Sequence, residues 1–143
     1  SLRGQGKSAT AQNVGDNGRY AMEVMAKEIR MGTIKTTEGF MVNSPSDIQF
    51  RSNMPNRNSA IVRFYLDTAT NQIMFDDDVS DALPPEPITS ANIAVNALTF
   101  NVSGVSLSSQ PRITIVMRAA SVGTAADIET RMDIQTTISP RSL

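Results

Sequence analysis

The apolar and polar residues follow a helical period in the stretch from Gly18 to Gly32. When this stretch is wound at about 100° per residue, its charged residues gather on one narrow stripe. The remaining apolar arc spans roughly 240°, whereas a helix that lies on a single core needs an arc of only about 100° or somewhat more. The pattern therefore favours either deep burial of the helix or a second partner on its outer side. The polar stripe consists of Arg19, Glu23, Lys27 and Arg30.

The two sides of this helix carry different predictions. We expect Met22, Met25 and Ile29 to face a sheet of the same chain, and the opposite side to contact neighbouring subunits. Glu28 interrupts the apolar arc, and an isolated buried carboxylate is costly. It therefore reaches the edge of the helix, pairs with an arginine of the sheet, or pairs across a subunit contact. The predicted assembly interface comprises Tyr20, Val24, Glu28 and Met31.

Residues 1–18 are polar and rich in glycine. Each glycine costs up to about 1 kcal/mol in a helix relative to alanine, so propensity predicts a flexible arm. The sequence Asp16-Asn17-Gly18 is typical of a turn or of a helix N-cap. We expect a single domain over residues 1–143, with an arm and helix over 1–31 and a β-rich head over 32–143.

After Gly32 the period changes to alternation, which is typical of half-buried strands. The residues between 66 and 72 have the length of a hairpin turn, and a phase change near Asn96-Ala97 predicts a β-bulge. The expected class is α+β, with the N-terminal helix packed on one antiparallel sheet of about seven strands. The predicted strands are 39–43, 47–51, 60–66, 72–76, 93–102, 111–118 and 128–138.

Composition removes most kinds of chemistry. The 143 residues include no Cys and no His, so the chain has no thiolate nucleophile and lacks the commonest general base. Lys and Arg number 13 against 14 Asp and Glu, without the basic cluster that binds phosphates, so we expect no nucleic acid partner. No catalytic constellation is present, and we expect a protein that is not an enzyme.

An acidic run lies in the loop 76–87, where prolines exclude both helix and interior strand. Closely spaced carboxylates supply the hard oxygen ligands that calcium prefers. The spacing differs from that of an EF-hand loop, so a solvated acidic loop is the alternative to a calcium site. Otherwise we expect no cofactor. The residues concerned are Asp76, Asp77, Asp78 and Asp81.

Three pieces of the chain resemble one family. The stretch Gly18–Gly32 is similar to the helix found early in the head domains of type IV pilin-like proteins, especially minor pilins and the large minor pseudopilins of type II secretion. The pieces 88–102 and 133–141 fit the same family. The resemblance implies a pilin-like head domain that serves as a structural subunit of a type IV pilus or a type II secretion pseudopilus, assembling through its N-terminal helix.

The resemblance also implies an upstream apolar helix and a prepilin peptidase site, neither of which is in this chain. The partners would then be other pilin or pseudopilin subunits and, through that upstream helix, the inner membrane. The location would be the cell envelope or an extracellular filament, with membrane anchoring before assembly. In the family the helix runs on from the membrane, which favours a helix over residues 1–18 with fraying up to about Gly6.

A different class of function stays open beside this one. The chain would be an adhesin-like or calcium-dependent binding module that uses the loops 52–59 and 76–87. Calcium binding that depends on Asp77 and Asp78 would favour this alternative.

Overall fold

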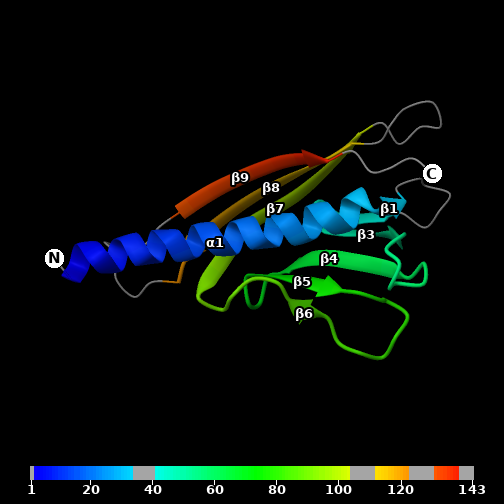
Figure 1. Ribbon diagram of the computed structural model, residues 1–143, viewed down its shortest axis with the longest axis horizontal. Coiled ribbons are helices and arrows are strands. Elements are labelled where there is room, and N and C mark those ends of the chain that lie inside the picture. The colour runs from blue at the N-terminus through cyan, green and yellow to red at the C-terminus, as the bar shows by residue number, and fades with distance from the viewer. Residues whose placement is uncertain (1, 34–40, 104–111, 123–130, 139–143) are drawn as a thin grey trace.

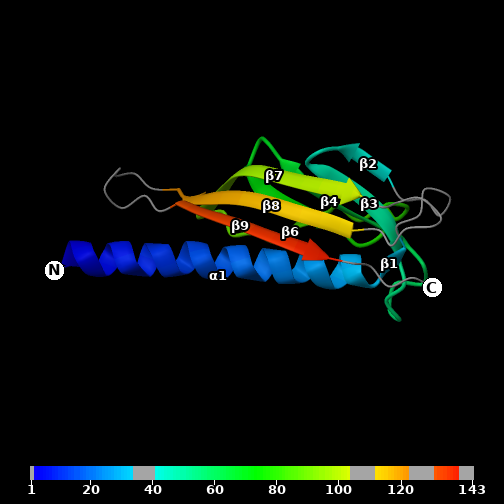
Figure 2. The same ribbon diagram turned by 90° about the horizontal axis from the view of Figure 1, so that it is seen from above.

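The computed structural model describes residues 2–33, 41–103, 112–122 and 131–138. These ranges contain a single helix, α1, which spans Leu2–Arg30 and runs along two antiparallel sheets (Figure 1). In these ranges the protein is mostly β, and the N-terminal end of the helix extends past the strands (Figure 2).

Residues 2–17 are helical and continuous with the predicted helix. The flexible arm that propensity predicts is therefore wrong, and the helix that the resemblance implies over this stretch is confirmed. Gly15 and Gly18 lie on the buried stripe of α1 rather than in a turn. Because both positions are buried, tertiary packing overrides their low helix propensity. The buried stripe consists of Val14, Gly15, Gly18, Ala21, Met22, Met25, Glu28 and Ile29.

The first sheet has six strands in the described part of the chain. Its order is β1-β3-β4-β5-β6, and β2 also pairs with β3. Every pairing is antiparallel. The strands are β1 (Gly32–Thr33), β2 (Met41–Ser44), β3 (Asp47–Ser52), β4 (Ile61–Asp67), β5 (Gln72–Asp76) and β6 (Glu86–Pro87).

The second sheet has three strands in the order β7-β8-β9, also antiparallel. They are β7 (Ile93–Ser103), β8 (Arg112–Ser121) and β9 (Arg131–Ile138). The helix contacts β8 and β9 of this sheet and β1 and β3 of the first. It therefore spans both sheets, as Figures 1 and 2 show.

The expectation of a helix packed on one sheet of about seven strands is wrong, and so is the α+β, pilin-like head arrangement built on it. The chain forms two sheets because β7 does not join the first sheet as a strand. Two of its backbone N–H groups instead donate to loop carbonyls of the first sheet, Val95 to Asn71 at 2.8 Å and Phe100 to Pro45 at 2.7 Å. Alternation along a strand indicates that it is half-buried but not which sheet it joins.

Several local predictions are confirmed. β4 and β5 form the predicted hairpin, with Asp67 opposite Gln72. The register of β7 against β8 shifts between Val95 and Ala97, where the bulge was expected. The two-residue strands β1 and β6 were not predicted. Residues 39–40, 104–111 and 128–130, and the side-chain alternation of the last strand, lie outside what the structure describes.

One hydrophobic cluster joins the helix to both sheets. Within it Phe50, Phe64 and Phe75 stack across β3, β4 and β5, with ring centroids 6.3 Å and 4.6 Å apart. Stacked aromatic pairs add to the energy of burial. The largest fully buried side chains include Phe50, Phe64, Met25, Ile29, Ile48, Ile73, Ile93, Ile113, Ile115 and Met117.

Candidate functional site

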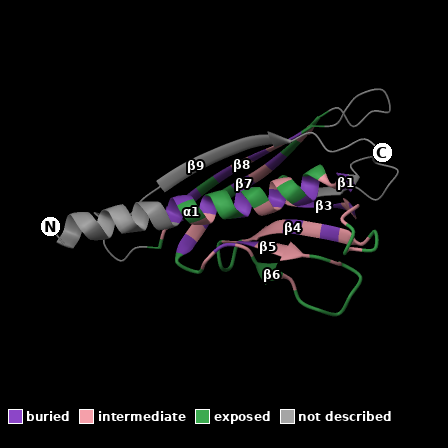
Figure 3. Ribbon diagram, viewed as in Figure 1, coloured by how far each residue is buried: buried purple, intermediate pink, exposed green. Residues whose placement is uncertain are grey.

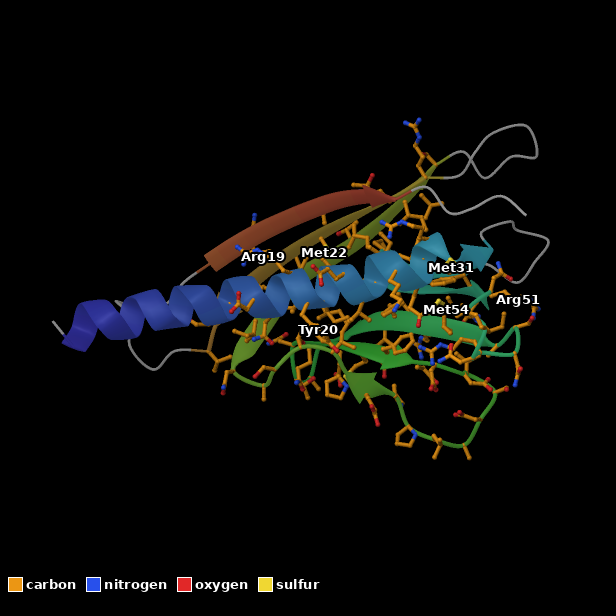
Figure 4. The ribbon with its side chains drawn as sticks, viewed as in Figure 1. Arg19, Tyr20, Met22, Met31, Arg51 and Met54 are labelled. Atoms are coloured by element: carbon orange, nitrogen blue, oxygen red, sulfur yellow. The ribbon has the colours of Figure 1, made fainter. Side chains whose placement is uncertain are left out.

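The outer face of α1 is the first candidate surface. Tyr20 is 57% exposed, and Val24 and Met31 are half-buried. On the other side Met22 is 6% exposed, and Met25 and Ile29 are fully buried. Figure 3 shows the exposed positions as a stripe along the helix, and Figure 4 labels Tyr20 on the helix and Met31 directly after its end. The helix therefore presents an aromatic side chain to solvent among charged residues.

Glu28 does not belong to this exposed face. It is 4% exposed, and its Oε1 accepts a hydrogen bond of 2.5 Å from Nη2 of Arg57 in the loop between β3 and β4. Arg57 lies over the Phe75 ring at 5.3 Å and reaches Asp77 at 3.5 Å. Of the three alternatives for Glu28, pairing with an arginine of the sheet comes nearest, but Arg57 lies in a loop between two strands of the sheet rather than on a strand. Arg57 thus ties the C-terminal end of α1 to the loops that follow β3 and β5.

Three of the four aspartates of the predicted calcium site accept hydrogen bonds within their own loop, and the fourth pairs with Arg57. Asp76, Asp78 and Asp81 each accept a hydrogen bond from the backbone N–H two residues later, which forms Asx turns. Asp77 is 55% exposed and pairs with Arg57. Both the backbone and the hydroxyl of Ser80 donate to Asp78, and these bonds lower its pKa. No group of three acidic residues in the described ranges is placed to hold a metal ion.

The loops 52–59 and 76–87 meet at a cleft of about 500 Å³. One wall is a tight turn, in which the Ala60 N–H donates to the Arg57 carbonyl and Asn58 and Ser59 have φ of 52° and 59°. These left-handed values are typical of a type I′ turn. Arg51 braces the wall by donating to the Ser59 carbonyl at 2.8 Å. The facing wall is Asp77 to Asp81, so guanidinium, amide, hydroxyl and carboxylate groups line the cleft.

Sequence reasoning missed two contacts that position these surfaces. Asn17, predicted in a turn or cap, lies inside α1 and its side-chain oxygen accepts from the Ser90 N–H at 3.0 Å. From the sequence, Arg57 is only one residue of the predicted loop 52–59. The sequence feature that pointed to a partner was the carboxylate of Glu28 on the apolar arc of the helix. It indicated that a cation was needed but not which one.

No family model, curated protein or solved structure matches the chain. Among the described residues, no helix is long and apolar enough to cross a membrane.

Proposed function

We propose that the protein is a structural subunit of a type IV pilus or a type II secretion pseudopilus, and that it assembles through the outer face of α1. The exposure of Tyr20 beside half-buried Val24 and Met31 carries this proposal. Exposed apolar surface marks interaction sites, and aromatic side chains are enriched at the centres of interfaces. The resemblance of residues 18–32 to the early helix of pilin heads supports the same face.

The proposed function also implies particular partners and a cellular location. The partners are other pilin or pseudopilin subunits, with anchoring in the inner membrane through an upstream helix before assembly. The location is the cell envelope or an extracellular filament. No enzymatic step and no nucleic acid belong to this proposal.

The absence of native cysteine makes accessibility labelling a direct test. Tyr20→Cys and, as a control, Val122→Cys are introduced into the gene at its own locus. Val122 is 62% exposed and does not belong to the helix. We expect a maleimide reagent to label Tyr20→Cys at least about tenfold more slowly in assembled filaments than in the purified chain, because the interface excludes water. Val122→Cys should label alike in both, and equal labelling of Tyr20→Cys would refute assembly through this face.

A second candidate function is an adhesin-like binding module, with or without calcium, at the cleft between loops 52–59 and 76–87. The meeting of these two loops in one cleft of about 500 Å³ favours it. Calcium is titrated into the wild-type chain and into Asp77→Asn/Asp78→Asn. Calcium-dependent stabilisation that the double variant lacks would support this function. An unchanged melting temperature and no binding heat would remove its calcium-dependent form.

A further inference from the structure

We infer that the acidic loop 76–87 of one copy docks on the outer face of α1 of a second copy. This inference rests on the proposed function and names the partner surface that the helix would contact.

Charge is segregated along the chain although the total is only −1. Residues 64–111 contain no Lys or Arg. On the loop, Asp81 and Glu86 are exposed, and the exposed Asp77 is already paired with Arg57. The outer face of α1 carries Arg19, Lys27 and Arg30, all exposed. Glu23 and Asp16 are the exposed anions of that face. Asp16 lies 3.4 Å from Arg19, and Glu23 precedes Lys27 by one helical turn, so Arg30 carries the excess positive charge at the C-terminal end of α1.

Each of these two surfaces also has an exposed apolar side chain. Leu83, between Asp81 and Glu86, is 70% exposed, which is the highest value among the large hydrophobic residues described. On the helix the corresponding residue is Tyr20. An apolar centre with a charged rim is the usual anatomy of a protein interface, and opposite charges on the two rims favour this pairing over like-charged alternatives.

Within one molecule Asp77, at the start of the loop, already reaches α1 indirectly, because Arg57 contacts both Asp77 and Glu28. The rest of the loop extends away from the helix (Figure 1). Figure 1 shows β4 and β5 between α1 and the loop that leads from β5 to β6, and Figure 3 shows that this loop is exposed. A contact between two different surfaces of identical subunits is heterologous, so it repeats from copy to copy and builds a ring or a filament. The pairing of loop and helix therefore supplies the kind of contact that a filament needs.

Disulfide trapping tests this geometry. The double variant Tyr20→Cys/Leu83→Cys is oxidised at high protein concentration and run on a non-reducing gel. We expect a ladder of dimer, trimer and higher species, because each chain joins its helix to the next chain's loop. An equal mixture of the two single variants should stop at the dimer. As a control, Tyr20→Cys is combined with Val122→Cys. Val122 is 62% exposed, close to the 70% of Leu83, and this pair should give no product above background.

Charge reversal gives an independent measurement. Lys27→Glu/Arg30→Glu should lower the ladder yield about tenfold, equivalent to about 1.4 kcal/mol. Added Asp81→Lys/Glu86→Lys should restore it. Because Asp81 accepts a hydrogen bond from Leu83, Asp81→Asn/Glu86→Gln is measured in parallel, since it keeps that acceptor. Raising salt from about 0.05 M to about 1 M should also lower the yield, because exposed charges are screened.

The outcomes separate this inference from the proposed function. If Tyr20→Cys is protected in filaments but no ladder forms, the docking of loop on helix is wrong and assembly through the helix stands. If a ladder forms but charge reversal leaves its yield unchanged, the electrostatic pairing is overturned. If Tyr20→Cys is neither protected nor trapped, both the inference and the proposed function fall.

Discussion

Arg57 makes contacts with two carboxylates and an aromatic ring. Its guanidinium contacts Glu28, Asp77 and the Phe75 ring, while Glu28 Oε2 and Arg57 Nε are buried without a hydrogen-bond partner. Desolvating an ion pair offsets much of its Coulomb attraction, but removing one partner leaves a buried charge. The pair itself therefore contributes little net stability, but removing one partner would leave the other charge buried and unpaired.

Arg57→Ala should lower the free energy of unfolding by about 3 kcal/mol or more, because it leaves the Glu28 carboxylate buried and unpaired. Arg51→Ala is the matched control, since it removes one exposed hydrogen bond to a carbonyl and should cost about 1 kcal/mol or less. Urea denaturation measures both. Glu28→Gln/Arg57→Met should be more stable than Arg57→Ala, and equal losses in all three variants would contradict the buried-charge account.

Ser80→Ala should raise the pKa of Asp78 towards its ordinary value, because the hydroxyl hydrogen bond is the largest cause of its lowering. A carboxyl whose pKa is lowered in the folded state stabilises the fold above its unfolded pKa, and this contribution is lost as the pH falls through the lowered value. Ser80→Ala should therefore weaken the acid dependence of stability below about pH 4. An NMR titration of the Asp78 carboxyl measures the shift, and an unchanged value in the variant would contradict it.

At the scale of elements, the position of β1 depends on the close approach of Gly32 to the ring of Phe50. A Cβ on Gly32 would lie 2.4 Å and 2.6 Å from two ring atoms of Phe50, a fully buried side chain. Overpacking of this kind costs about 1–3 kcal/mol. Gly32→Ala should show a loss in this range by chemical denaturation. Wild-type stability in this variant would mean that the ring moves aside freely.

The hairpin of β4 and β5 turns at Asn71, whose φ is 55°. Asparagine and glycine tolerate this left-handed backbone, whereas β-branched residues do not. Asn71→Gly should change stability by less than about 0.5 kcal/mol, and Asn71→Val should cost about 1–2 kcal/mol. Thermal melts compare the two variants, and equal melting temperatures would contradict the account of the turn.

Sequence reasoning predicted local elements better than their arrangement. The hairpin and the bulge near Asn96 follow from period and turn chemistry, which act over a few residues. The helical state of residues 2–17, which propensity misses and the resemblance implies, and the separation of β7 from the first sheet depend on contacts between distant segments. Asn17 with Ser90 and Glu28 with Arg57 are such contacts. The sequence contains both charged residues, but only the folded chain brings Arg57 and Glu28 together.

At the scale of the whole molecule, α1 and strands of both sheets share one hydrophobic cluster, from Val14 to Ala119. The apolar face of each sheet is buried against residues of the same cluster in the other sheet and the helix. We therefore expect one cooperative unfolding transition. Urea curves followed by far-ultraviolet circular dichroism and by tyrosine fluorescence should have the same midpoint. Separate midpoints would show that one sheet unfolds alone and would contradict the single core.

The backbone bonds of β7 to the loops at Pro45 and Asn71 also have a consequence at high local concentration. A free strand edge is a template for another chain and hence for amyloid-like growth. Here loop carbonyls take up the N–H groups of Val95 and Phe100, while β6 ends at Pro87, which has no N–H to offer. At these three positions the strands therefore offer no free backbone N–H to a strand of a neighbouring copy.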